Sequence, residues 1–188
     1  GGDQALMVDW LLAVMAAAVP SGRRLALPNW SVGNPDTEAV ANGVYDPLWH
    51  ALAASGSRHV LATHEYAHSS PVREPFHIGR YKAILARFDT LRLKRPVTVI
   101  TETGRDLGGG QDGWRTVFSE AEYAEFLQEI ETIYAPDGVT GCVFCYGPGF
   151  DQRWQTYNVE GATGLLARMA GMNDGNIPEE PEGDDMVP

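Results

Sequence analysis

Apolar residues fall into two kinds of segment along this chain, and the two kinds alternate. Segments with helix-forming composition and helix-start signals cover residues 3–18, 46–54, 76–88, 119–134 and 161–170. Short apolar runs typical of strands cover residues 23–30, 58–63, 97–101 and 139–145. An initial helix followed by four strand-helix units predicts an α/β fold with a parallel sheet and right-handed crossovers.

The number of units limits the architecture. A complete eight-unit barrel takes ~250 residues, whereas this chain has 188. Four units therefore correspond to half of a (β/α)8 TIM barrel or to a small open sheet. The initial helix has no strand before it. This favours the second half of a barrel, which would occupy residues 1–172. The opening Gly-Gly-Asp, without a methionine, leads us to expect that the protein begins further upstream.

The acidic composition changes which partners we expect. The formal net charge is -11 and the pI is about 4.8, so we expect no nucleic-acid interface, which needs a basic face. Residues 173–188 combine acidic side chains with proline and glycine, and we expect a disordered tail there. No apolar run approaches the ~18 residues of a membrane span, so no membrane partner is expected.

Two of the predicted strands run directly into a glutamate. The β-branched run at residues 97–101 ends at Glu102, and the run at 58–63 continues into His64-Glu65-Tyr66. Parallel strands end at a common rim, where α/β proteins place their chemistry, and neighbouring strands lie ~4.8 Å apart. We therefore expect Glu102 and Glu65 to share one rim within the ~5 to 9.5 Å that separates the paired carboxylates of glycosidases. Alternatively, each glutamate is a rim residue held by an arginine.

Aromatic side chains cluster on or after the predicted strand ends. Their flat apolar faces suit stacking on sugar rings, although each could instead pack in the core. The aromatic candidates for sugar binding are Trp30, Tyr66, Trp114, Tyr146 and Trp154. Asn34, in the loop after the first strand, is a further candidate contact.

Five short motifs, spread over about residues 3–164, resemble the second half of a TIM-barrel glycoside hydrolase of the large retaining clan, clan A. The motifs are Pro28-Asn29-Trp30-Ser31-Val32-Gly33-Asn34-Pro35, His64-Glu65-Tyr66, Gly79-Arg80-Tyr81, Ile100-Thr101-Glu102-Thr103-Gly104, and Val143-Phe144 with the later Trp154. The resemblance implies retaining hydrolysis of O-glycosidic bonds, a carbohydrate substrate, and neither a cofactor nor a metal.

The same resemblance implies roles for individual residues. The clan's nucleophile is a glutamate at the end of strand seven, which corresponds to Glu102. The aromatic or histidine residue at the end of strand six corresponds to His64 and Tyr66, which would orient the nucleophile. A tryptophan after strand eight corresponds to Trp154, which would form the floor of the sugar site.

One part of the clan's machinery has no counterpart. Its acid/base glutamate follows an asparagine at the end of strand four, and the chain contains no Asn-Glu pair. Glu65 is then the candidate acid/base within the chain, or a substrate contact if an upstream glutamate exists. Because a four-stranded sheet leaves open edges, we also expect association with a missing N-terminal half or with a second copy.

Two other functions are compatible with the sequence. His64-Glu65-Tyr66-Ala67-His68 matches the H-E-x-x-H zinc protease motif, in which two histidines one helical turn apart bind the metal. That motif needs a helix, whereas the preceding residues favour a strand and Pro71 would interrupt a helix. The remaining alternative is a non-catalytic, carbohydrate-binding barrel fragment.

Overall fold

The computed structural model of the chain describes residues 2–68, 70, 72, 77–106, 113–144 and 152–172. In these residues four parallel strands form one sheet in the order β1-β2-β3-β4. The strands are β1 (Ala26–Trp30), β2 (Val60–Ala67), β3 (Thr98–Arg105) and β4 (Thr140–Val143). The predicted parallel α/β fold is confirmed, while the expected tail at 173–188 and Tyr146 lie outside the described residues.

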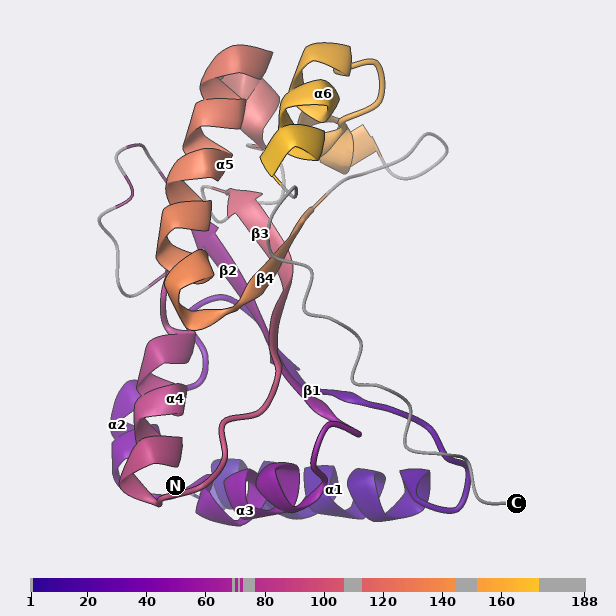
Figure 1. Ribbon diagram of the computed structural model, residues 1–188, viewed down its shortest axis with the longest axis vertical. Helices are drawn as coiled ribbons and strands as arrows, with labels where there is room; N and C mark the ends of the chain where they lie inside the picture. Colours follow the sequence, from indigo (N-terminus) through magenta and orange to yellow (C-terminus); the bar gives the residue numbers. More distant parts are fainter. Residues whose placement is uncertain are drawn as a thin grey trace.

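Helices cover one side of this sheet. They are α1 (Gly2–Ala18), α2 (Thr37–Ala41), α3 (Asp46–Ala54), α4 (Tyr81–Thr90), α5 (Glu120–Tyr134) and α6 (Thr163–Met172), with short 3-10 turns at Trp114–Thr116, Ala135–Asp137 and Gln152–Tyr157. In Figure 1, α2, α4 and α5 lie along one side, α1 and α3 at the foot, and α6 at the upper end. The described chain places no helix on the opposite side of the sheet. None of the described helices is both long and apolar enough to cross a membrane.

The predicted helix starts rest on local hydrogen bonding. Helix α5 begins with a capping box, in which the Ser119 hydroxyl accepts from the Glu122 amide at 3.3 Å and the Glu122 carboxylate accepts from the Ser119 amide at 2.8 Å. Helix α3 starts with Asp46 and Pro47, as predicted. The short helix α2 was not predicted, although Asp36 caps it by accepting from an amide of its first turn.

The central strands are longer than predicted. Strands β2 and β3 were expected to end at Thr63 and Thr101, but their ladder continues through the pair Ala67 and Arg105. Residues expected on a loop at the rim therefore lie inside strands, where successive side chains face opposite sides of the sheet. This alternation decides which of the candidate residues can meet.

The hydrophobic core lies between the sheet and the helices. Trp30 packs edge-on against Tyr45 and Trp49, with ring centroids 5.0 and 5.9 Å away. Trp114 stacks on Tyr123 of α5 at 4.8 Å, with the ring planes 1° apart. Trp30 of β1 thus packs against the start of α3, and Trp114 packs against α5.

Candidate functional site

Three predicted residues meet on the helix-free side of the sheet. The Tyr66 hydroxyl donates to Glu102 Oε2 at 3.0 Å, and His64 Nδ1 lies 3.2 Å from the same oxygen. His64 and Tyr66 lie two residues apart on β2 and therefore share a face, and His64 is the ladder partner of Glu102 on β3. The structure thus brings Glu102, His64 and Tyr66 together, as the family resemblance implied, while their roles stay predictions.

A bulge in β3 turns Glu102 toward this face. Thr63 pairs with Ile100, but the next pair is His64 with Glu102, so Thr101 is an extra residue with no partner in the ladder. Ile100 is fully buried in the core on the helical side. In regular alternation Glu102 would face the same side as Ile100, and the extra residue reverses this.

The Glu102 carboxylate is anchored at one oxygen only. Both contacts reach Oε2, and no residue of the described chain donates to Oε1. The side chain is 36% exposed. Burial, followed by the negative charge of Glu102, raises the pKa of Tyr66 well above its usual value, so the Tyr66 hydroxyl keeps its proton and remains a donor.

Glu65 faces the opposite side of the sheet and is 1% exposed. Its carboxylate accepts from the amides of Gly79 and Tyr81 at 2.5 and 2.9 Å, and from the Tyr134 hydroxyl at 3.2 Å. Burial raises the pKa of Glu65 to about 7, while these donors and the Arg80 amide act to lower it. The side chain therefore ties the N-terminus of α4 to strand β2.

The expectation that Glu65 and Glu102 share one rim is wrong. Glu65 pairs in the ladder with Thr103, and both of their side chains contact the Tyr134 hydroxyl of α5. Neighbouring residues of a strand point to opposite faces, so placing His64 beside Glu102 sends Glu65 into the core. Glu65 is therefore not placed to act as an acid/base partner of Glu102.

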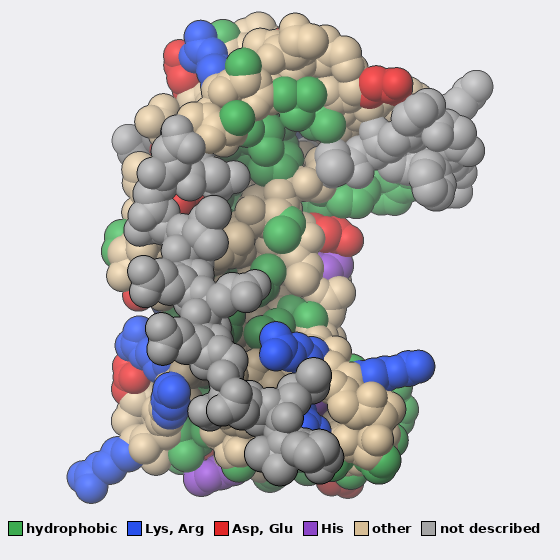
Figure 2. All heavy atoms as spheres, turned by 45° about the vertical axis from the view of Figure 1, so that its right-hand side comes forward, with side chains coloured by type: hydrophobic (Ala, Val, Ile, Leu, Met, Phe, Trp, Pro, Cys, Tyr) green, Lys and Arg blue, Asp and Glu red, His purple; other side chains and the backbone are tan. Residues whose placement is uncertain are grey.

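Aromatic rings continue from Tyr66 along the upper end of the sheet. Phe144 lies 6.4 Å from the Tyr66 ring and 5.6 Å from that of Trp154, and Trp154 lies 5.5 Å from Tyr157. The Tyr157 hydroxyl donates to Asp106 at 2.5 Å. Figure 2 shows a recess on this side of the molecule, with acidic and histidine side chains beside hydrophobic ones.

Trp154 is thus connected to Tyr66 through the ring of Phe144, and its role as the floor of a sugar site stays a prediction. Tyr157 and Asp106 were not predicted from the sequence as site residues. Their only sequence signals are an aromatic side chain after the last strand and a carboxylate just after β3.

Three other candidates lie away from this cluster. Trp30 and Trp114 are 8% and 1% exposed and pack in the helical core, so the expectation that they contact sugar is wrong. Trp114 additionally donates its indole N–H to the Tyr157 carbonyl at 3.2 Å. Asn34 is exposed on the loop after β1, and its amide donates to the Ser31 hydroxyl at 3.4 Å. Large rings near strand ends were needed for packing.

The zinc protease motif does not have the required geometry. Residues 64–67 lie in strand β2, so the histidine and glutamate of the motif face opposite sides of a sheet instead of one side of a helix. The described residues contain no group of three or more side chains that could hold a metal ion.

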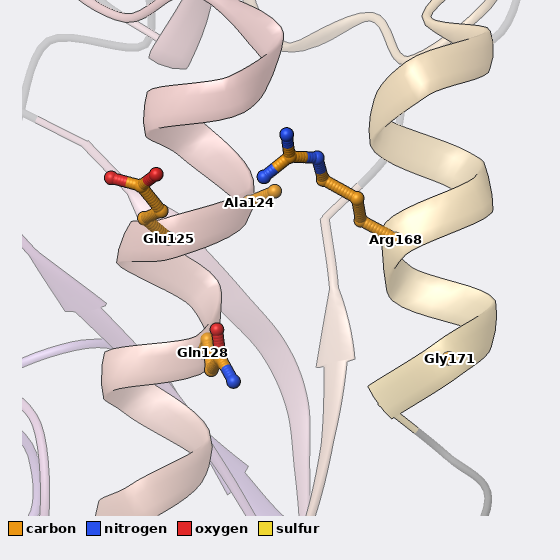
Figure 3. Close-up of a pocket in the computed structure, with 5 residues that line it drawn as sticks. All are labelled: Ala124, Glu125, Gln128, Arg168 and Gly171. Carbon is orange, nitrogen blue, oxygen red and sulfur yellow. The ribbon is translucent and has the colours of Figure 1, made fainter.

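A separate groove of about 310 Å³ lies between α5 and α6, on the helical side. Figure 3 shows Arg168 extending from α6 toward Ala124 of α5, while Glu125 points away from the groove. The groove contains no paired acid and base and lies on the other side of the sheet from Glu102.

Comparison of the chain with protein-family models, with curated proteins and with solved structures found no match. The function is therefore argued from the geometry of the Glu102 cluster.

Proposed function

We propose that the chain is the second half of a (β/α)8 barrel belonging to a retaining glycoside hydrolase, with Glu102 as the nucleophile. The observation that carries this proposal is the one-sided anchoring of Glu102, whose Oε2 is held by Tyr66 and His64 while Oε1 stays open among the described residues. In retaining hydrolysis a carboxylate oxygen attacks the anomeric carbon and forms a glycosyl-enzyme intermediate.

The anchoring suits that reaction. The hydrogen bond from Tyr66 and the contact with His64, both from strand β2, fix the direction of the carboxylate, and a fixed direction lowers the entropic cost of attack. His64 Nδ1 lies 3.2 Å from Glu102 Oε2, and the buried Nε2 of His64 has no hydrogen-bond partner among the described residues. Neither His64 nor Tyr66 blocks the open oxygen, so both can stay in place while the glycosyl bond forms and breaks.

The neighbouring aromatic side chains support a carbohydrate substrate. Trp154 is partly exposed, and the rings of Phe144 and Tyr157 brace it. A partly exposed ring beside a carboxylate offers an apolar surface for a sugar face next to a polar group for its hydroxyls. Trp154 is thus the proposed floor of the site.

The acid/base group has to come from elsewhere, because Glu65 is committed to α4. A barrel partner would supply it by extending the sheet beyond β1 or β4, which are its two edges in the described chain. Helix α1 carries Leu6 and Trp10 one turn apart, 68% and 63% exposed, as expected of a face that another unit covers. We propose a missing N-terminal half as this partner, with a second copy of the chain as the alternative.

Hydrolysis of 2,4-dinitrophenyl glycosides tests this proposal, because their leaving group departs without protonation and an acid/base is not needed for the first step. The 188-residue chain should release a burst of dinitrophenolate equal to the enzyme concentration. The Glu102→Gln variant should show no burst, and Glu125→Gln, an exposed control on α5, should behave like the parent. Sugar binding with no burst in the parent would favour the non-catalytic fragment.

A further inference from the structure

We propose that Asn29 binds the sugar that reacts at Glu102, by donating a hydrogen bond from its side-chain amide to one hydroxyl group of the ring. This inference rests on the proposed glycosidase function and adds a residue that determines which sugars fit.

Asn29 lies at an irregularity of β1. Pro28 pairs with Ala62 and Trp30 with Thr63, so Asn29 is an extra residue between two ladder pairs. Its φ is 60°, in the left-handed region that residues other than glycine seldom adopt, although asparagine tolerates it. This geometry lets Trp30 pack in the core while the Asn29 side chain remains exposed.

A side-chain hydrogen bond joins Asn29 to the bulge beside the nucleophile. The Thr101 hydroxyl donates to Asn29 Oδ1, and Thr101 Oγ1 also lies 3.3 Å from the Thr63 carbonyl of β2. The extra residues of β1 and β3 therefore meet across β2, although their strands are not neighbours. Thr101 directly precedes Glu102 in β3. This hydrogen bond therefore holds the Asn29 amide beside the residue that is next to the nucleophile in sequence.

The hydrogen bond also fixes which end of the amide is available. Since Oδ1 accepts from Thr101, the Nδ2 group remains with two N–H donors, and no described residue accepts from it. A sugar hydroxyl is an acceptor that this group can bind. The Asn29 amide approaches the site from β1, which is not a neighbour of β3 in the sheet, so it would bind a ring hydroxyl other than the reacting group at the anomeric carbon.

Two substitutions separate binding from a purely structural role. Asn29→Gly removes the amide and keeps the backbone, because glycine adopts a positive φ without strain. Thr101→Val removes the hydroxyl that orients the amide and keeps the side-chain shape, and Thr101→Ser restores that hydroxyl. Neither side chain makes a hydrogen bond to the side chain of Glu102, His64 or Tyr66 in the described structure.

The experiment measures the second-order rate constant of the dinitrophenolate burst with 2,4-dinitrophenyl glucoside, galactoside, mannoside and xyloside, and with the 3-, 4- and 6-deoxy analogues of the best of these. The parent chain should react at least about 10-fold faster with the full sugar than with one deoxy analogue, which is the range of one lost hydrogen bond. Asn29→Gly should abolish that preference by slowing the full sugar alone. Thr101→Val should reduce it, and Thr101→Ser should recover it.

The outcomes distinguish this inference from the function on which it rests. A structural role would slow all substrates equally, and that result, or an unchanged preference in Asn29→Gly and Thr101→Val, would overturn the inference while leaving Glu102 as the nucleophile. Absence of any Glu102-dependent burst in the parent chain would overturn both proposals.

Discussion

Glu65 and Glu102 project from opposite faces of one sheet, although they lie in adjacent rungs of the same ladder. Glu65 pairs with Thr103, which follows Glu102, and Glu102 pairs with His64, which precedes Glu65. Glu65 is enclosed and receives hydrogen bonds from the start of α4. Glu102 is partly exposed, accepts a hydrogen bond from Tyr66 and lies close to His64, both of β2. One glutamate therefore stabilises the fold, and the other is available for chemistry.

The structural role of Glu65 predicts a large stability loss on truncation. Glu65→Ala leaves the buried donors of Gly79, Tyr81 and Tyr134 without their acceptor, so the free energy of unfolding should fall by about 3 kcal/mol. Urea denaturation measures this change. The exposed control Glu125→Ala should change stability by less than about 0.5 kcal/mol. An equally small effect of Glu65→Ala would show that this carboxylate does not hold α4.

The raised pKa of Glu65 predicts a pH dependence. Its pKa is about 7 in the folded chain and 4.5 in the reference state, so the folded state binds the proton more tightly. The contribution to stability is complete below pH 4.5 and is lost as the pH rises through about 7. Unfolding free energies from pH 4 to 8 should show a decline of about 3 kcal/mol in the parent chain, relative to Glu65→Gln. A parallel profile in the two proteins would contradict this assignment.

Tyr66 and Tyr134 offer a matched pair, since each donates its hydroxyl to a glutamate on its own side of the sheet. Tyr66→Phe should slow the dinitrophenolate burst by about 10- to 100-fold, which corresponds to one hydrogen bond to a charged group, with little loss of stability. Tyr134→Phe should lower stability and leave the burst rate close to that of the parent. Equal effects of the two variants on the burst would remove the proposed role of Tyr66.

The three tryptophans should also differ in role, two of them stabilising the fold and the third binding the sugar. Trp30→Ala and Trp114→Ala should each cost about 3 to 5 kcal/mol of unfolding free energy, because both rings are enclosed in the core. Trp154→Ala should cost less, because its ring is partly exposed, and should raise the KM for dinitrophenyl glycosides. Unfolding and burst measurements on the three variants test this. Unchanged KM in Trp154→Ala would remove it from the sugar site.

The sequence predicted the order of the elements because apolar periodicity and cap residues are local signals. The α/β alternation, the start of α3 at Asp46 and the cap of α5 at Ser119 follow from such signals. The placement of His64 and Tyr66 beside Glu102 was implied by the family resemblance, whereas the polar residues at the ends of two apolar runs led us to pair Glu102 with Glu65.

The sequence did not predict which side of the sheet each residue faces. Two strands run on by four residues, to Ala67 and Arg105, and a bulge at Thr101 reverses the alternation just before Glu102. Both features depend on pairing between distant segments, which local composition does not encode. The prediction that Trp30 and Trp114 contact sugar failed for a related reason. Rings next to a strand end can pack against helices, and local sequence does not show where those helices lie.

As the proposed nucleophile, Glu102 should form a covalent bond to the anomeric carbon. Incubation of the chain with 2,4-dinitrophenyl 2-deoxy-2-fluoroglycosides, followed by intact-mass measurement and peptide mapping, tests it directly, because the fluorine slows breakdown of the glycosyl-enzyme. We expect the mass of one fluoroglycosyl group on the peptide that contains Glu102, and no addition in Glu102→Gln. An unlabelled chain with every sugar tested, or a label that persists in Glu102→Gln, would contradict the account.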